Sequence, residues 1–100
     1  MAYVLQLDFE IEGPFGDEMA EEFSDLAKSI NDEEGFIWKI WTEKPERNEA
    51  GGIYIFETEE DAENYLEMHT NRMKDMGVME INAKIFDINS KLTDITNGPI

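Results

Sequence analysis

The chain has 100 residues, which is enough for one domain with a modest hydrophobic core. Its 24 acidic residues outnumber 8 basic ones, and the net charge of −16 disfavours nucleic acid and anionic membranes as partners. Because there is no cysteine, disulfides, thiolate nucleophiles and thiolate metal ligands are excluded.

The first half of the chain predicts a strand, a helix and a hairpin. Residues 3–11 alternate between apolar and polar side chains, which is typical of a strand covered on one face. Over residues 17–30 the apolar residues recur at helical spacing, and acidic residues occupy the first turn, where the helix dipole favours them. Residues 36–42 and 52–56 then form the two strands of the hairpin, which are separated by a charged loop.

The second half predicts a helix, a strand and a tail. Thr58 is the expected N-cap of the helix, with Asp61 in the capping-box position, and Gly77 is a suitable residue just past its end. Residues 78–88 alternate again as a last strand. Residues 89–100 are expected to dock on the domain as a C-terminal tail without forming an independent element.

This order of elements predicts one α+β domain over residues 1–100, with the ferredoxin-like βαββαβ fold. Right-handed crossovers place both helices on one face of a four-stranded antiparallel sheet. The faces of the third strand stay unassigned, because Gly51 and Gly52 can introduce a bulge. The face under the helices is expected to carry Leu5, Leu7, Phe9, Trp38, Ile40, Ile81, Ala83 and Ile85. The open face is expected to carry Gln6, Asp8, Lys39, Trp41, Lys84 and Phe86.

The mixture of aromatic and charged residues on that open face suits contact with a second copy of the chain. We therefore expect a homodimer. The N-terminal residues lack the pattern of a signal peptide and no segment has the length of a membrane span, so a cytoplasmic protein is expected.

His69 is the only histidine and lies on the apolar stripe of the second helix. One interpretation is that His69 is a buried core residue whose ring forms a hydrogen bond with a neighbouring residue. Alternatively, it points into a cavity between helix and sheet, where it serves as a general base or binds a substrate oxygen.

Four further residues are candidates for the same cavity. Trp38 is expected to face the helices, and Tyr54 and Tyr65 carry hydroxyl groups within apolar patterns. Arg72 lies one turn beyond His69, where it can close the cavity mouth or form a surface ion pair. The structural alternative for the aromatic residues is simple core packing. The catalytic candidates are thus His69, Trp38 and Tyr54, and the substrate-binding candidates are Trp38, Tyr54, Tyr65 and Arg72.

Several chemistries lack their characteristic residues. No glycine-rich loop precedes a helix, and no serine lies in a nucleophile elbow. A single histidine without the spacing of a second ligand disfavours a zinc or iron site. We therefore expect neither a metal nor an organic cofactor.

The chain resembles the YdhR family of monooxygenases in several segments that occur in the same order. They are VLQLDFEIEGPFGDEMAE, LAKSIN, GFIWKIWTE, EAGGIYIF, YLEMHTNRMKDMGV and AKIFDIN. The resemblance implies a dimeric α/β barrel built from two such sheets. It also implies kinship with antibiotic-biosynthesis-type monooxygenases, some of which oxidise phenolic aromatics without a cofactor.

On that resemblance, the expected function is cofactor-independent oxygenation of a small phenolic or quinone-like compound by molecular oxygen. Trp38, Tyr54 and His69 are the residues expected to carry it. Two alternatives stay open: a dimer that binds such compounds without catalysis, and an isomerase or haem-handling protein on the same fold.

Overall fold

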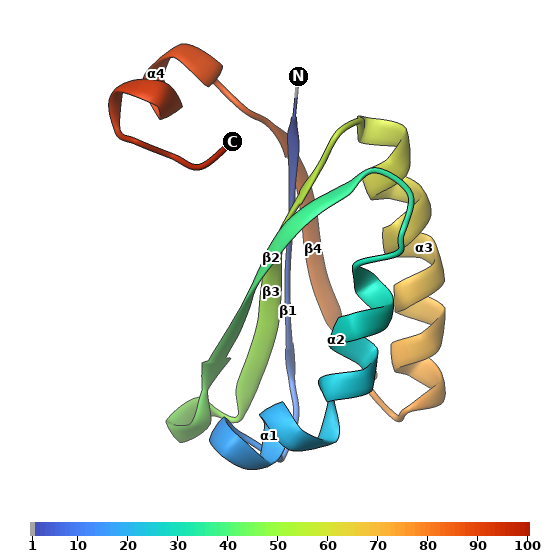
Figure 1. The fold of residues 1–100 in the computed structure, drawn as a ribbon. Coiled ribbons are helices and arrows are strands. Elements are labelled where there is room, and N and C mark those ends of the chain that lie inside the picture. The colour runs from blue at the N-terminus through green and yellow to red at the C-terminus, as the bar shows by residue number, and fades with distance from the viewer. Residues whose placement is uncertain (1) are drawn as a thin grey trace.

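The computed structural model describes residues 2–100 and contains one sheet and several helices (Figure 1). Its elements in chain order are β1 (Tyr3–Glu10), α1 (Gly16–Glu22), α2 (Ser24–Ile30), β2 (Phe36–Lys44), the 3₁₀ turn η1 (Pro45–Arg47), β3 (Glu49–Phe56), α3 (Glu59–Asp75), β4 (Ile81–Asp87) and α4 (Ser90–Ile95). The strands form one antiparallel sheet in the order β2-β3-β1-β4. This is the ferredoxin-like arrangement, so the predicted fold is confirmed.

The helices α1, α2 and α3 cover one face of the sheet (Figure 1). α3 begins as predicted, since the backbone N–H of Asp61 donates to the Thr58 hydroxyl at 3.0 Å. Gly77 follows it with a φ of +91°, a conformation that glycine adopts without strain. The single helix expected over residues 17–30 is instead divided at Phe23 into α1 and α2. Within residues 2–100, none of the helices has the length and apolarity needed to cross a membrane.

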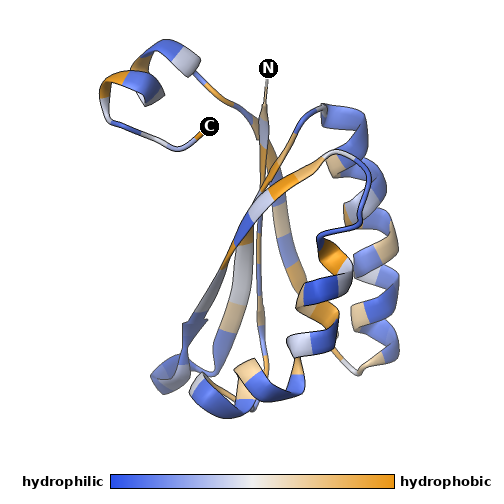
Figure 2. Ribbon diagram, in the orientation of Figure 1, coloured by the Kyte–Doolittle hydropathy of each residue, from blue (hydrophilic) through white to orange (hydrophobic). Residues whose placement is uncertain are grey.

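The core lies between the sheet and these helices. Hydrophobic and hydrophilic residues alternate along the strands, and hydrophilic residues dominate the outer surfaces of the helices (Figure 2). The core therefore draws on alternate positions of the inner strands and on one stripe of each helix. Its buried members are Leu5, Leu7, Ile30, Tyr54, Phe56, Ala62 and Tyr65.

A β-bulge in β2 reverses the expected orientation of that strand. Phe36 pairs with Phe56, but Trp38 pairs with Ile55, so Ile37 is an extra residue between them. Because side chains alternate along a strand, one extra residue moves all that follow it to the opposite face. Lys39 and Trp41 therefore face the helices, beside Tyr54 and Gly52 of β3. Trp38 and Ile40 face the other way, and the prediction for all four was wrong.

The same pairing corrects the expectation about Gly51 and Gly52. Both glycines pair in register with β1 and β2, so the bulge lies in the preceding strand. The expected orientations of β1 and β4 agree with the structure: Phe9, Ile81, Ala83 and Ile85 pack against the core.

The C-terminal tail contains α4, which the sequence analysis did not predict. Asn89 caps this helix by accepting from the backbone N–H of Leu92 at 3.1 Å. The tail lies on the side of the sheet opposite α3 (Figure 1), where the indole N–H of Trp38 donates to the Pro99 carbonyl at 2.7 Å. Leu92 and Ile95 do not pack on their own chain, since 61% and 75% of their surfaces are exposed.

Deleting residues 91–100 should lower the melting temperature by several degrees. The deletion removes the Pro99 acceptor and uncovers Trp38, and a loss of about 1 kcal/mol lowers the melting temperature of a domain this small by about 4–8 °C. Circular dichroism during heating measures the change. Trp38→Phe removes only the hydrogen bond, so it should account for part of the decrease. An unchanged melting temperature in the truncated chain would show that the tail does not stabilise the domain.

Candidate functional site

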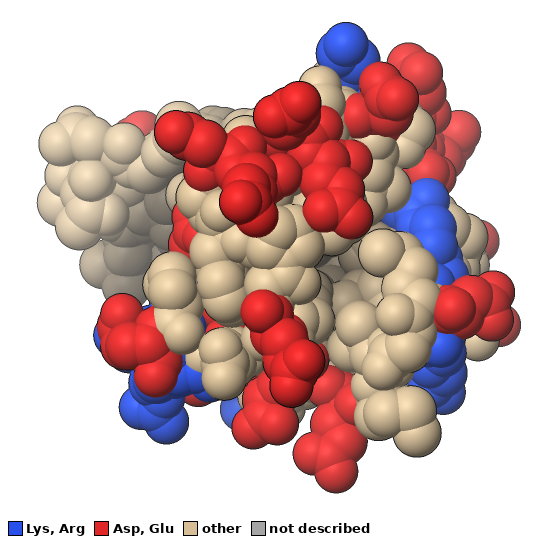
Figure 3. Space-filling view, turned by 90° about the horizontal axis from the view of Figure 1, so that it is seen from below, with Lys and Arg blue, Asp and Glu red and all other residues tan. Residues whose placement is uncertain are grey.

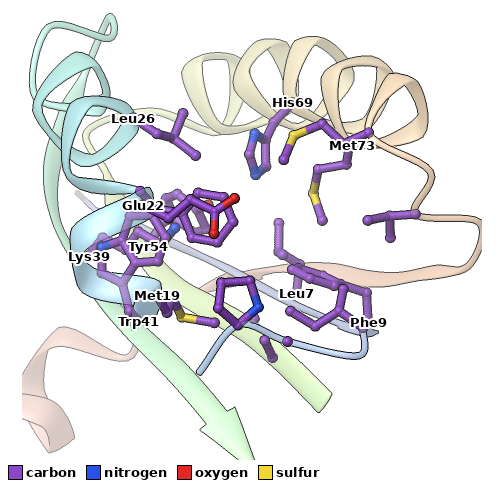
Figure 4. Close-up of a pocket in the computed structure, with 18 residues that line it drawn as sticks. Leu7, Phe9, Met19, Glu22, Leu26, Lys39, Trp41, Tyr54, His69 and Met73 are labelled. Carbon is purple, nitrogen blue, oxygen red and sulfur yellow. The ribbon is translucent and has the colours of Figure 1, made fainter. Parts of the chain in front are cut away.

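A cavity of about 250 Å³ lies between the sheet, α1, α2 and α3 (Figure 4). Its lining is mostly apolar, with contributions from Leu7, Phe9, Met19, Leu26 and Met73. The polar or aromatic groups that share it are Glu22, Lys39, Trp41, Tyr54 and His69. A mostly apolar cavity that is partly open to solvent and has a few convergent polar groups is the usual form of a small-molecule site.

α3 places His69 in this cavity and also carries Arg72, which determines which ring nitrogen of His69 is protonated. Tyr65, His69 and Met73 lie on the buried stripe of α3, and the His69 ring points toward the sheet (Figure 4). Arg72, one turn further along, approaches Nδ1 of His69 with Nη2 at 2.9 Å and Nε at 3.3 Å. Because a guanidinium only donates, Nδ1 accepts and the neutral ring carries its proton on Nε2. His69 therefore presents a hydrogen-bond donor to the cavity.

The surroundings of His69 also keep it uncharged. Burial, the Arg72 guanidinium and Lys39 together lower the pKa of His69 to about 3. At neutral pH the ring is therefore neutral, and its one basic nitrogen already accepts from Arg72. Of the two roles expected from the sequence, a hydrogen bond to a ligand oxygen is compatible with this neutral ring, whereas a general base is not, because Nδ1 already accepts from Arg72.

This shift of the His69 pKa predicts that acid weakens the fold. The unfolded chain binds a proton at His69 near pH 6.5, but the folded chain binds it only near pH 3. Stability should therefore fall as the pH decreases from about 6.5 towards 3. Urea unfolding should show that the free energy of unfolding is lower at pH 4.5 than at pH 7. The decrease in the wild-type protein should exceed the decrease in His69→Gln by on the order of 1 kcal/mol, after allowance for solvent screening. Equal decreases in both proteins would contradict this prediction.

Two tyrosines support His69 from the core side. The Tyr65 hydroxyl donates to the Tyr54 hydroxyl at 3.2 Å, and the Tyr65 ring stacks on His69 with 5.1 Å between centroids. Burial raises the pKa of both tyrosines, so both are neutral phenols. Tyr54 lines the cavity, whereas Tyr65 lies behind it and holds Tyr54 and His69 in place.

Lys39 enters the cavity from β2 and lies between aromatic rings. Its Nζ is 3.3 Å from the centroid of the Trp41 ring and 4.4 Å from that of Tyr54. Gly52 provides the space, since a Cβ at that position would lie 2.6 Å from Lys39 Cε. Trp41 in turn stacks on Phe23 at 6.4 Å. The result is a cationic side chain set against a wall of aromatic rings.

Burial and then the positive charge of Arg72 lower the pKa of Lys39 to about 7. The ring faces act in the opposite direction, because they favour the ammonium form. Burial dominates, so both the amine and the ammonium are populated near neutral pH. A lysine in this state can accept a proton from a ligand.

The structure brings together some of the residues expected from the sequence and separates one. His69 and Tyr54 line the cavity, and Tyr65 and Arg72 contact His69 directly. Trp38 lies on the opposite face of the sheet, because the bulge at Ile37 reverses β2. Trp41 takes the place expected for Trp38 in the cavity wall.

Together with Glu22 and Trp41, Lys39 is a cavity residue that sequence reasoning missed. Strict alternation placed it on the open face, where a lysine needs no explanation. The available signal was its position between two tryptophans in an otherwise apolar strand. This position indicates that Lys39 lies in the cavity only once the bulge in β2 is known.

Comparisons with known proteins agree with this architecture. The model of the family described as "Putative mono-oxygenase ydhR" matches residues 4–99. A solved structure described as "Structural Genomics, protein YJCS" superposes with a TM-score of 0.62, covering 88% of this chain and 98% of that one. Since the two sequences are 22% identical, this likeness shows the fold alone. Among curated proteins, none matches the chain.

Proposed function

The chain belongs to the ydhR family, and from this membership and its cavity we propose that it oxygenates small phenolic or hydroquinone-like compounds without a cofactor. The observation that carries the proposal is the convergence of Lys39 and His69 on one apolar cavity. Lys39 supplies a base near neutral pH, and His69 supplies a neutral donor. These are the two groups that oxidation of a phenol by oxygen needs from a protein.

The reaction begins with removal of the phenol proton. The neutral amine of Lys39 accepts this proton, and Nε2–H of His69 donates to the resulting phenolate oxygen. The rings of Trp41 and Tyr54 hold the amine between them, at the wall of the cavity that the substrate enters. The apolar lining excludes water, which strengthens both interactions.

Molecular oxygen then serves as the oxidant. Electrons of the phenolate form a bond from a ring carbon to one oxygen atom, and the Lys39 ammonium returns its proton to the peroxide. The O–O bond then breaks as the same carbon loses hydrogen, which gives a quinone and one molecule of water. One oxygen atom of O₂ enters the product and the other leaves as water, so the atoms and electrons balance.

The negative surface charge favours substrates that are uncharged before they enter the cavity. Acidic residues are spread over the end of the molecule at which α1 lies, with residues other than Lys and Arg between most of them (Figure 3). The overall charge of −16 repels anions that approach from solution. A neutral phenol that becomes an anion only inside the cavity avoids this repulsion.

Oxygen uptake with a panel of naphthols and hydroquinones tests the proposal directly. With ¹⁸O₂ as the only labelled reagent, a naphthol should yield a quinone that contains one labelled oxygen atom. Binding of a naphthol, measured by tryptophan quenching, without any oxygen uptake would instead support the alternative of a binding protein.

The haem alternative fits the geometry less well. Iron would need the lone pair of Nε2, but the contact of Arg72 with Nδ1 keeps the proton on Nε2. Titration with haemin should therefore produce no spectral change that depends on His69. Loss of such a change in His69→Ala would support haem binding.

We also propose that two copies of the chain pair through the open sheet face. Ile40 and Phe86 lie on that face and expose 51% and 46% of their surfaces, which is unusual for residues of this kind in a monomer. The exposed Leu92 and Ile95 of α4 lie on the same side of the sheet (Figure 1). Light scattering at micromolar concentration should give twice the chain mass, and Phe86→Glu should shift it towards the monomer. A monomeric parent protein would contradict the pairing.

A further inference from the structure

We propose that Lys39 is a carbonyl-reactive amine, which forms an imine with small aromatic aldehydes that enter the cavity. This activity needs no oxygen and no phenolic hydroxyl, so it does not depend on the oxygenase function proposed above. The argument rests on the surroundings of Lys39 and on the groups that face it across the cavity.

The first observation is that Lys39 forms no ion pair, although the carboxylate of Glu22 lines the same cavity. In residues 2–100 the ion pairs are Lys44 with Glu46 and Arg47 with Glu49, all near the η1 turn. Lys39 instead contacts the rings of Trp41 and Tyr54, at 3.3 Å and 4.4 Å from their centroids. This is unexpected in a chain with 24 acidic residues, where carboxylates are abundant. A carboxylate partner would hold the lysine protonated, and its absence leaves the nitrogen able to react.

The second observation is the pair of conditions that activates a lysine nucleophile. Such lysines lie in apolar pockets or next to another cation, and both conditions hold here. The cavity lining is mostly apolar, and the charge of Arg72 acts on Lys39. The resulting pKa of about 7 leaves a large fraction of the amine unprotonated at neutral pH.

The third observation is a donor in the same cavity for the carbonyl oxygen. As the Lys39 nitrogen attacks the carbonyl carbon, the C=O electron pair moves onto oxygen, and Nε2–H of His69 can donate to that oxygen. One proton then passes from the nitrogen to this oxygen, and a second proton from solvent lets the oxygen leave as water while the nitrogen lone pair forms the C=N bond. The remaining N–H proton is lost to solvent, so the protons balance. The product is an imine between Lys39 and the aldehyde carbon, and hydrolysis reverses the reaction.

The cavity also limits which aldehydes can react. Its volume of about 250 Å³ suits small aromatic compounds of one or two rings, and the rings of Trp41 and Phe23 form part of its wall. Benzaldehyde is therefore the probe of choice, since it has the ring and the carbonyl but no phenolic proton. The chemistry expected for phenols cannot occur with it.

Reductive trapping provides the test. The full-length protein is incubated at pH 7 with benzaldehyde and sodium cyanoborohydride, and peptide mass spectrometry measures benzylation at each lysine. Lys39 should react at least ~10-fold faster than Lys28, which is exposed on α2, because an ordinary lysine is almost fully protonated at this pH. Lys39→Arg should abolish the fast labelling, and Lys28→Arg should leave it unchanged.

Comparison of the lysines within the wild-type protein keeps the test decisive even if Lys39→Arg folds poorly. Gly52→Ala gives a second check, because the added methyl would meet Lys39 Cε and displace the amine. That variant should label Lys39 more slowly than the parent. Labelling of Lys39 no faster than that of Lys28 would overturn the inference, and the proposed phenol chemistry would then be tested by oxygen uptake alone.

Discussion

Replacing Lys39 with methionine should lower the turnover of a naphthol at pH 8 by ~10²–10⁴-fold, the usual contribution of a general base. Methionine keeps much of the length of lysine and suits the ring contacts of Lys39 with Trp41 and Tyr54, so the cavity should keep its shape. Binding of the naphthol, measured by tryptophan quenching, should change little. The loss should therefore appear in kcat rather than in KM.

The pH profile of the wild-type protein gives an independent check on the same role. A base acts in its unprotonated form, and the pKa of Lys39 is lowered to about 7. The value of kcat/KM should therefore rise with pH through about 7 and then level off. Lys28→Met, at an exposed position of α2, should keep both the rate and the profile. An unchanged rate in Lys39→Met would remove Lys39 from the mechanism.

Replacing His69 with leucine should lower kcat by ~10²–10³-fold, which is typical for loss of one donor to a developing oxyanion. The reason is that Arg72 occupies Nδ1 and leaves Nε2–H for the substrate oxygen. His69→Gln should retain more activity than His69→Leu, because its amide N–H can still donate. Oxygen uptake at saturating naphthol distinguishes the three proteins.

The tautomer of His69 can be measured without any substrate. Nitrogen NMR of the ¹⁵N-labelled protein should show Nε2 protonated and Nδ1 unprotonated at pH 7. Arg72→Ala should shift the ring towards a mixture of tautomers. If His69→Leu stabilises the protein and leaves both binding and turnover unchanged, His69 is only a packing residue.

Local patterns in the sequence were sufficient to predict most of the fold. The change from alternating to helical periodicity located each major element, and Thr58 and Gly77 marked the ends of α3 because their local chemistry favours those positions. His69 was identified as a cavity residue because an imidazole in an apolar stripe needs a polar partner.

The inner details of the site depend on contacts that no short pattern records. The proton position on His69 follows from the distance to Arg72, which the sequence suggested as a residue at the cavity mouth or on the surface. The role of Lys39 follows from a bulge that alternation cannot predict, because an extra residue leaves the local composition unchanged. Trp38 was misplaced for the same reason.

The extra residue in β2 also bears on how such a site can change in descent. Loss of Ile37 alone would remove the bulge but leave Trp38 opposite Ile55 and Lys39 opposite Tyr54, so Lys39 would still face the helices. A deletion of three nucleotides at this point would thus change how the chain enters β2 without moving the amine to the other face. The cavity is in this respect insensitive to the length of the chain that precedes it. Removing Ile37 should therefore leave naphthol binding and oxygen uptake close to those of the parent protein, and loss of uptake with binding retained would contradict this reading of the bulge.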